Sequence, residues 1–398
     1  MTEGASVISA GEIFSAFLKL GLASFGGPIA HVGYFHREFV ERRRWIDDAQ
    51  YAQLVAVSQF LPGPASSQIG FSLGLIRGGW LGALAAFLGF TLPSALLMFA
   101  FAYVTPRLDT ALGAALLHGF KLVAVAVVAH GVITMAARLT PDLRRRLIAL
   151  AAATVVVLSG TAVVQLAVVA GGALLGMLLC RREVSIGGAT FSVRYGAKAG
   201  VLLLVIFACL LGLALMPDGG LPRLLAAAKA FYRAGALVFG GAHVVLPLLE
   251  ETVVAPGWID ADEFLAGYGA AQAVPGPMFS VAAFLGARLD ATAAIAGSLI
   301  GIGAIFLPGM LLVAGVLPMW RMIARRERAV NALAGINAAV VGLLAAALYD
   351  PVWTSAVLAP TDAAIALIGL LMLAFARASV LIVLVWCVLA AVIRAMFG

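Results

Sequence analysis

Several stretches of this chain run almost without charge for about the length of a bilayer-crossing helix. They cover residues 79–103, 202–216, 293–317 and 330–348. A helix needs roughly 20 apolar residues to cross the hydrocarbon core of a bilayer, where every backbone polar group must be bonded inside the protein. Hydrophobic residues make up 63% of the chain and charged residues 11%, far outside the usual range for soluble domains. We therefore expect an all-α polytopic membrane protein.

The basic residues responsible for the net charge of +7 lie in short clusters between the apolar stretches. The clusters fall within residues 37–44, 138–146, 181–182 and 321–328. Such clusters orient membrane proteins, because cytoplasmic loops carry an excess of Lys and Arg. No nucleic-acid-binding motif lies between them, so nucleic acid is not an expected partner.

An internal repeat organises the chain. The segment FLKLGLASFGG at 17–27 returns as FYRAGALVFGG at 231–241. Further on, WID at 45–47 returns at 258–260, and Pro-Gly-Pro at 62–64 returns at 275–277. One unit has therefore been used twice. We predict a first half over 1–198 and a second over 223–398, joined over 199–222 by one unmatched span and a Pro/Gly-rich loop, so that the second half is inverted.

Each half contains two breaks that a continuous helix would not carry without a kink or stop. They are the Gly-Gly pairs, the first of which is followed by Pro28, and the Pro-Gly-Pro motifs. We predict that each is the tip of a re-entrant helical hairpin, with about nine true spans besides. Hairpins that return to their own side place the basic loops at 37–48, 138–146, 181–198 and 318–328 inside. The acidic loop at 250–263, which lacks Lys and Arg, then lies outside.

These breaks predict an anion site. Irregular backbone at membrane depth is tolerated only where protein buries it or where it lines a cavity, so we expect the tips to meet near the midplane. Helices that begin after each break point free N–H groups and positive dipole ends toward the tips. Lys19 and Arg233, at equivalent repeat positions, would offset the charge of an anion. Purely structural kinks, and snorkelling of the two cations to the lipid headgroups, stay open as alternatives.

Other chemistry has little support in the sequence. The chain has no Walker A motif, no paired catalytic carboxylates in a span and no metal-ligand set, so we expect neither an enzyme nor a cofactor. Cys180, Cys209 and Cys387 are an odd set in or beside apolar segments, and we interpret them as packing residues. Lys121 and His118 share a helical face, where they form either part of a pathway or a satisfied pair. No proton-coupling residue stands out; Glu38, Glu251 and the histidines are candidates.

These motifs resemble the chromate ion transporter family over nearly the whole chain, in its two-domain, long-chain form. The resemblance rests on FGGPIAH at 25–31, WID at 45–47, QFLPGP at 59–64, FGG at 239–241 and QAVPGP at 272–277. It implies chromate efflux across a bacterial cytoplasmic (inner) membrane, driven by the proton motive force, with chromate resistance as the phenotype and sulfate as the structural analogue. Ala242 stands where the first half has Pro28, so the two hairpins need not contribute equally.

Repeat position, helix polarity and resemblance together give the predicted substrate-binding residues. They are Lys19, Phe25, Gly26, Gly27, Pro28, Gln59, Pro62, Gly63, Pro64, Ser66, Ser67, Arg233, Gly240, Gly241, Gln272, Pro275, Gly276, Pro277 and Ser280. Ser66, Ser67 and Ser280 add hydroxyl donors just after the breaks. Uptake or exchange of sulfate or another oxyanion, or an anion channel, would share all these features. Transport direction and oligomeric state, a homodimer included, are also open.

Overall fold

The computed structural model describes residues 8–25, 27–107, 110–159, 162–180, 191, 193–217, 219–239, 245–323 and 326–397. Within these residues the regular structure is entirely helical, which confirms the all-α prediction. Five of the described helical stretches are long and apolar enough to cross a membrane, and these are Ala65–Arg107, Ala111–Leu139, Ala197–Leu215, Ala294–Ile323 and Glu327–Ala356. The chain is therefore a multi-pass helical protein.

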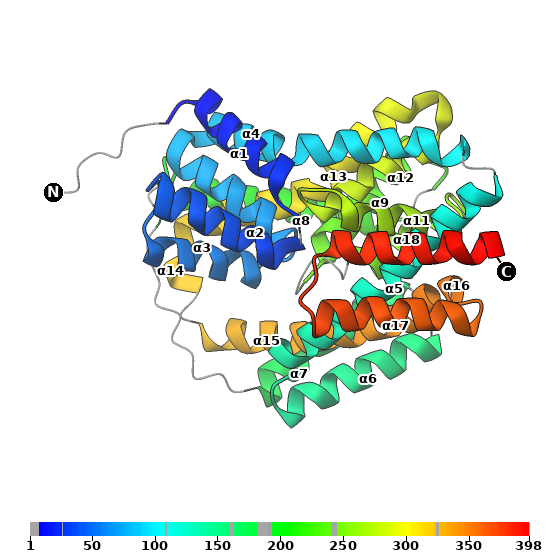
Figure 1. Ribbon diagram of the computed structural model, residues 1–398. Coiled ribbons are helices and arrows are strands. Elements are labelled where there is room, and N and C mark those ends of the chain that lie inside the picture. Colours follow the sequence, from blue (N-terminus) through cyan, green and yellow to red (C-terminus); the bar gives the residue numbers. More distant parts are fainter. Residues whose placement is uncertain are drawn as a thin grey trace.

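Figure 1 shows the elements of the first half and of the linking span in chain order. The helices are α1 (Ala10–Ala23), α2 (Gly27–Phe35), the π-helical segment η1 (His36–Arg42), α3 (Asp48–Phe60), α4 (Ala65–Val104), α5 (Ala111–Leu139), α6 (Leu143–Ser159) and α7 (Ala162–Leu179). The unmatched apolar span is α8 (Ala197–Leu215).

The second half repeats this order after α8. Its helices are α9 (Arg223–Leu237), α10 (Val245–Val253), α11 (Ala261–Ala273), the 3-10 turn η4 (Met278–Ser280), α12 (Val281–Leu289), α13 (Ala294–Val316), α14 (Trp320–Ile323), α15 (Glu327–Ala347), α16 (Thr354–Ala356), α17 (Pro360–Ala374) and α18 (Val380–Phe397).

Helix α4 corresponds to α12 and α13 together. It is broken at Gly79, whose φ of 66° and ψ of −157° are not helical, and α12 is separated from α13 at the corresponding place. The segments on either side of each break pack glycine on glycine, Gly74 against Gly82 and Gly286 against Gly297. The chain therefore folds back on itself after each Pro-Gly-Pro motif before it enters the long helix that contains Pro93 or Pro308.

The helices near the end of each half pack against helices of the other half. Helix α5 of the first half packs against α17 and α18, whereas α15 of the second half packs against α6 and α7. Figure 1 shows α6, α7, α15 and α17 together in the lower part of the molecule. Gly172 and Gly176 of α7 lie directly on Gly335 of α15, so small residues let these two helices approach closely.

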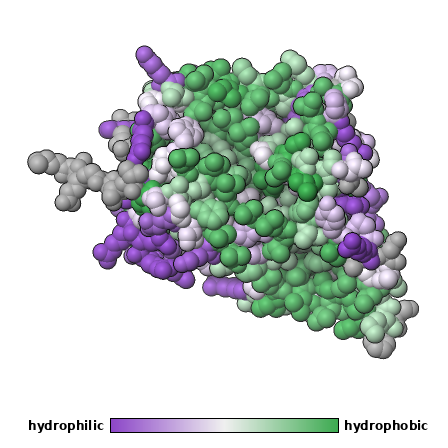
Figure 2. Space-filling view, turned by 90° about the horizontal axis from the view of Figure 1, so that it is seen from above, coloured by the Kyte–Doolittle hydropathy of each residue, from purple (hydrophilic) through white to green (hydrophobic). Residues whose placement is uncertain are grey.

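The surface has an apolar area between two hydrophilic margins (Figure 2). Contacts bring the basic start of α6 to the end of α7, because Arg144 Nη1 donates to Leu179 O at 2.7 Å. A Cβ at Gly176 would lie 2.4 Å from Asn331 O, which places the start of α15 there too. This is the charge distribution expected of a protein that crosses a bilayer in one fixed orientation.

Candidate functional site

Each Pro-Gly-Pro tip touches the break of the opposite half. The Gly276 N–H donates to Ser24 O at 2.9 Å, and the Gly63 N–H donates to Val238 O at 2.7 Å. Ser24 ends α1 and Val238 ends α9, so both contacts join equivalent residues of the repeat. We call the Gly276–Ser24 contact junction A and the Gly63–Val238 contact junction B. The two junctions connect the halves at the centre of the fold.

Only glycine fits at the centre of each tip. Gly63 has a φ of +120° and Gly276 a φ of +101°, a region that side chains with a Cβ rarely adopt. A Cβ at Gly63 would lie 3.0 Å from Gly309 Cα, and one at Gly276 would lie 3.2 Å from Phe90 O. The tips therefore approach the long helices α13 and α4 of the opposite half more closely than other residues would allow.

A helical segment begins immediately after each tip. Helix α4 starts at Ala65 and η4 starts at Met278, and the preceding residues, Pro64 and Pro277, provide no side-chain cap. The first N–H groups of such helices have no partner within the helix and carry a partial positive charge. This arrangement can bind an anion.

Two equivalent hydroxyls accompany these helix starts. Ser67 and Ser280 are 3% and 1% exposed, and neither hydroxyl has a hydrogen-bond partner among the described residues. Buried hydroxyls are normally bonded, because leaving one unpaired costs about 1–3 kcal/mol. A bound ligand or water would satisfy them. Ser66 is also buried, as are Pro62, Pro64, Pro275 and Pro277.

Gln68 is a residue that the sequence analysis did not identify. Its Nε2 donates to Pro62 O at 2.8 Å and to Gly309 O at 3.1 Å, so one amide connects the first tip to α13 of the other half. A glutamine directly after the small residues that follow Pro-Gly-Pro was the available signal. The predicted Gln59 is exposed, and Gln272 instead donates to Met278 Sδ at 2.7 Å.

The predicted cations lie apart from the tips in the described contacts. Lys19 is exposed on α1. Arg233 is half-buried on α9 and interacts electrostatically with Glu251. Phe25 is half-buried, Gly27 begins α2 and Pro28 follows it, whereas Gly26, Gly240 and Gly241 lie outside the described residues.

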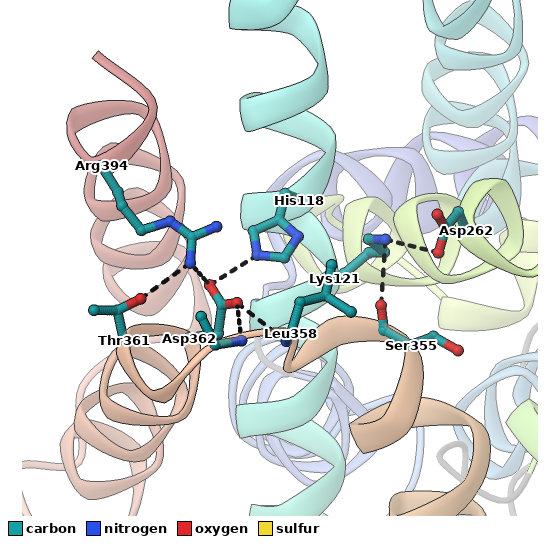
Figure 3. A network of polar contacts seen from close by, with 9 residues as sticks. His118, Lys121, Asp262, Ser355, Leu358, Thr361, Asp362 and Arg394 are labelled. Carbon is teal, nitrogen blue, oxygen red and sulfur yellow. Dashed lines mark hydrogen bonds and ion pairs between the residues drawn. The ribbon is translucent and has the colours of Figure 1, made fainter. Parts of the chain in front are cut away.

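His118 and Lys121 are both satisfied by partners from the second half (Figure 3). His118 Nε2 lies 2.9 Å from Asp362 Oδ1, and Lys121 Nζ lies 2.7 Å from Asp262 Oδ1. Arg394 also pairs with Asp362, which is fully buried and accepts the backbone N–H groups of Leu358 and Ala359. The sequence left open whether these residues form part of a pathway or are satisfied by partners, and the structure shows them satisfied by partners.

His36 lies in a cluster of charged side chains at the surface, with Asp48 and Glu41. The hydrogen bond that His36 donates to the Asp48 carboxylate is the main cause that raises the pKa of His36, and Glu41 adds to it. His36 Nε2 lies 2.6 Å from Asp48 Oδ1 and Nδ1 lies 3.2 Å from Glu41 Oε1. No group of three or more His, Cys, Asp or Glu residues within the described part of the chain is arranged to hold a metal ion.

Comparison with known proteins decides the family. A family model described as "Chromate transporter" matches residues 11–177 and again residues 225–393. The chain belongs to the chromate transporter family. Its members are transporters rather than enzymes, which agrees with the expectation from the motifs.

Relatives match along most of the chain. It is similar to the "Chromate transport protein" of Pseudomonas aeruginosa, with 30% identity over 346 residues that cover 85% of this chain and 80% of that protein. It is 29% identical to the "Probable chromate transport protein" of Synechococcus elongatus over 85% of this chain and 83% of that protein. The "Chromate transport protein" of Cupriavidus metallidurans is 26% identical over 85% and 81%. No solved structure matches the chain.

Proposed function

We propose that this protein exports chromate across the bacterial cytoplasmic membrane, driven by the proton motive force, and so confers chromate resistance. The observation that carries the proposal is the family match over both halves, together with relatives named for chromate transport. The geometry adds a physical reason, since uncapped helix starts and unpaired hydroxyls suit a small oxyanion.

The proposed mechanism is alternating access between two inverted halves. The two junctions are the points where one half can rock against the other while the anion stays near the midplane. Junctions A and B each rest on a backbone hydrogen bond between the halves, and such contacts can break and reform during a cycle. The re-entrant hairpins, the halves at 1–198 and 223–398 and the inverted topology belong to this proposal.

The topology is tested by labelling introduced cysteines. Cys209 is exposed whereas Cys180 and Cys387 are buried, so a Cys209→Ser background removes the reactive native thiol. Ala49→Cys and Ala255→Cys, both at exposed positions, report on the basic and acidic loops. An impermeant reagent should label position 255 from outside and position 49 only after permeabilisation. Labelling of both from the same side would refute the hairpin topology.

Function is tested by the movement of radiolabelled chromate into everted membrane vesicles. Chromate should accumulate when a proton gradient is present, and excess sulfate should compete because it has similar size and charge. Accumulation without a gradient, or currents far faster than a transport cycle permits, would support exchange or a channel instead. Absence of any chromate movement with correctly inserted protein would remove chromate as the substrate.

The contribution of the two cations is tested in the same vesicles. We propose that Lys19 and Arg233 offset the charge of the dianion along its path. Lys19→Gln and Arg233→Gln should each weaken transport strongly. Normal chromate transport by a correctly inserted double variant would show that both residues merely anchor the helices at the membrane surface.

A further inference from the structure

The two junctions differ sharply in polarity, although the repeat makes them equivalent in the backbone. Around junction A the first half places Ser24, His31, Thr91 and Ser94. The equivalent positions around junction B hold Val238, Val245, Phe306 and Gly309. Val238, Val245 and Phe306 are at most 1% exposed, so hydrocarbon occupies these three positions at junction B.

The contacts place these polar residues around junction A. Ser24 O accepts both the Gly276 N–H and, at 3.1 Å, His31 Nε2. The His31 ring meets the Phe90 ring at 5.3 Å between centroids, and Ser94 Oγ donates to Thr91 O at 2.9 Å. A Cβ on Gly276 would lie 3.1 Å from Ser94 Oγ. The second tip therefore rests on the end of α1 and on α4, and His31 of α2 contacts both of these.

Polar atoms around junction A lack partners among the described residues. The hydroxyls of Ser24, Thr91 and Ser280 are unpaired, and these residues are 1%, 3% and 1% exposed. His31 Nδ1 is also unpaired, while its Nε2 must carry the proton because the Ser24 carbonyl can only accept. Three hydroxyl donors next to an uncapped helix start can together bind an oxyanion.

Junction B bonds its tip to the opposite half through a side-chain amide, although the Ser67 hydroxyl and Gln68 Oε1 there have no partner among the described residues. Gln68 donates to Pro62 O and Gly309 O, and Val281 occupies the position in the second half that corresponds to Gln68. The amide therefore closes the first tip onto α13, whereas the second tip has no such side chain. Sequence divergence between the halves has therefore left more unpaired polar atoms around junction A and an amide that closes the tip at junction B.

We infer that the transported oxyanion binds at junction A, through the hydroxyls of Ser24, Thr91 and Ser280, and that junction B is a structural pivot without a second anion. Thr91 lies midway between the break at Gly79 and the end of α4 at Val104, which is the depth expected of a transporter site. His31 is a positioning residue, since its Nε2–H holds the carbonyl that also anchors the second tip. This inference rests on the proposed function for the identity of the anion.

The test is equilibrium binding of radiolabelled chromate and sulfate to purified protein in lipid nanodiscs. Thr91→Val removes a hydroxyl at nearly constant shape, whereas Thr91→Ser keeps it. A hydrogen bond to a charged ligand contributes enough that Thr91→Val, Ser24→Ala and Ser280→Ala should each weaken chromate binding by about tenfold. Thr91→Ser should bind within about twofold of the unaltered protein by the same reasoning, as should the control Ser58→Ala, whose buried hydroxyl already donates to Leu54 O.

The outcomes separate this inference from the proposed function. If the three variants bind chromate and sulfate as tightly as the unaltered protein does, the anion does not use junction A and the inference fails. If the unaltered protein binds an anion, loses it in these variants and yet moves no chromate in vesicles, junction A stands and chromate export fails. Equal losses in Thr91→Ser and Ser58→Ala would mean that any change at a buried hydroxyl disrupts the fold, which also overturns the inference.

Discussion

Replacing Gly276 with alanine tests whether the crossed tips hold the two halves together. The residue has a φ of +101°, so a Cβ adds backbone strain of about 1–2 kcal/mol. The new atom would also lie 3.1 Å from Ser94 Oγ and 3.2 Å from Phe90 O, close enough to push the tip away from α4 and weaken its bond to Ser24 O, at a further cost of about 1 kcal/mol. The expected loss of unfolding free energy is therefore about 2–3 kcal/mol.

The assay is unfolding of purified protein in mixed micelles, followed by tryptophan fluorescence, with chromate flux measured on the same variants. Gly257→Ala is the matched control, because Gly257 also has a positive φ, of 70°, but no atom lies within 4 Å of its added Cβ. It should lose only the strain, about 1 kcal/mol, and keep its flux. If Gly276→Ala is as stable and as active as Gly257→Ala, the contact of the second tip with α4 and Ser24 O does not contribute the stability expected of it.

Three further outcomes follow from the same structure. Asp362→Ala leaves Arg394 without its buried partner and should cost about 3–5 kcal/mol, seen as a lower unfolding midpoint. Gly172→Val would overpack the α7–α15 contact, where an added Cβ lies 2.7 Å from an α15 side chain, by about 1–3 kcal/mol; unchanged stability would contradict that packing. Asp48 raises the pKa of His36, so this pair contributes fully to the free energy of unfolding below the ordinary His pKa and loses its contribution as pH rises through the raised value. The unfolding free energies of His36→Gln and of the unaltered protein should therefore converge at high pH.

The order of helices could be predicted from the sequence because apolar length and helix breakers act locally. Pro lacks the N–H that a helix interior requires but is tolerated where a helix begins, so Pro64 and Pro277 directly precede the helical segments that begin at Ala65 and Met278. The unmatched span appears as α8 for the same reason, since its apolar length leaves it few other solutions. Ser67 and Ser280 were likewise identifiable, because they stand at equivalent positions just after equivalent breaks.

The site itself could be predicted only in part. Ser24 and His31 flank the first Gly-Gly break, whereas Thr91 is far from them in the sequence, and none of the three belongs to a motif of charged or metal-binding residues. Their common feature is burial without a partner, which exists only once α1, α2 and α4 pack around the second tip. The sequence did not identify Gln68 for the same reason, because its partner Gly309 lies in the other half.

The sequence by itself determined that this chain is a helical membrane protein built from two copies of one unit, because lipid demands long apolar helices and a repeat is visible in the residues themselves. Tertiary structure alone decided that each tip crosses to the opposite half, and that α5 and α15 exchange their partner helices. Those choices depend on contacts between residues roughly two hundred positions apart, and local propensity carries no information about such pairs. The polarity of one junction and the closure of the other therefore became visible only when the halves were brought together.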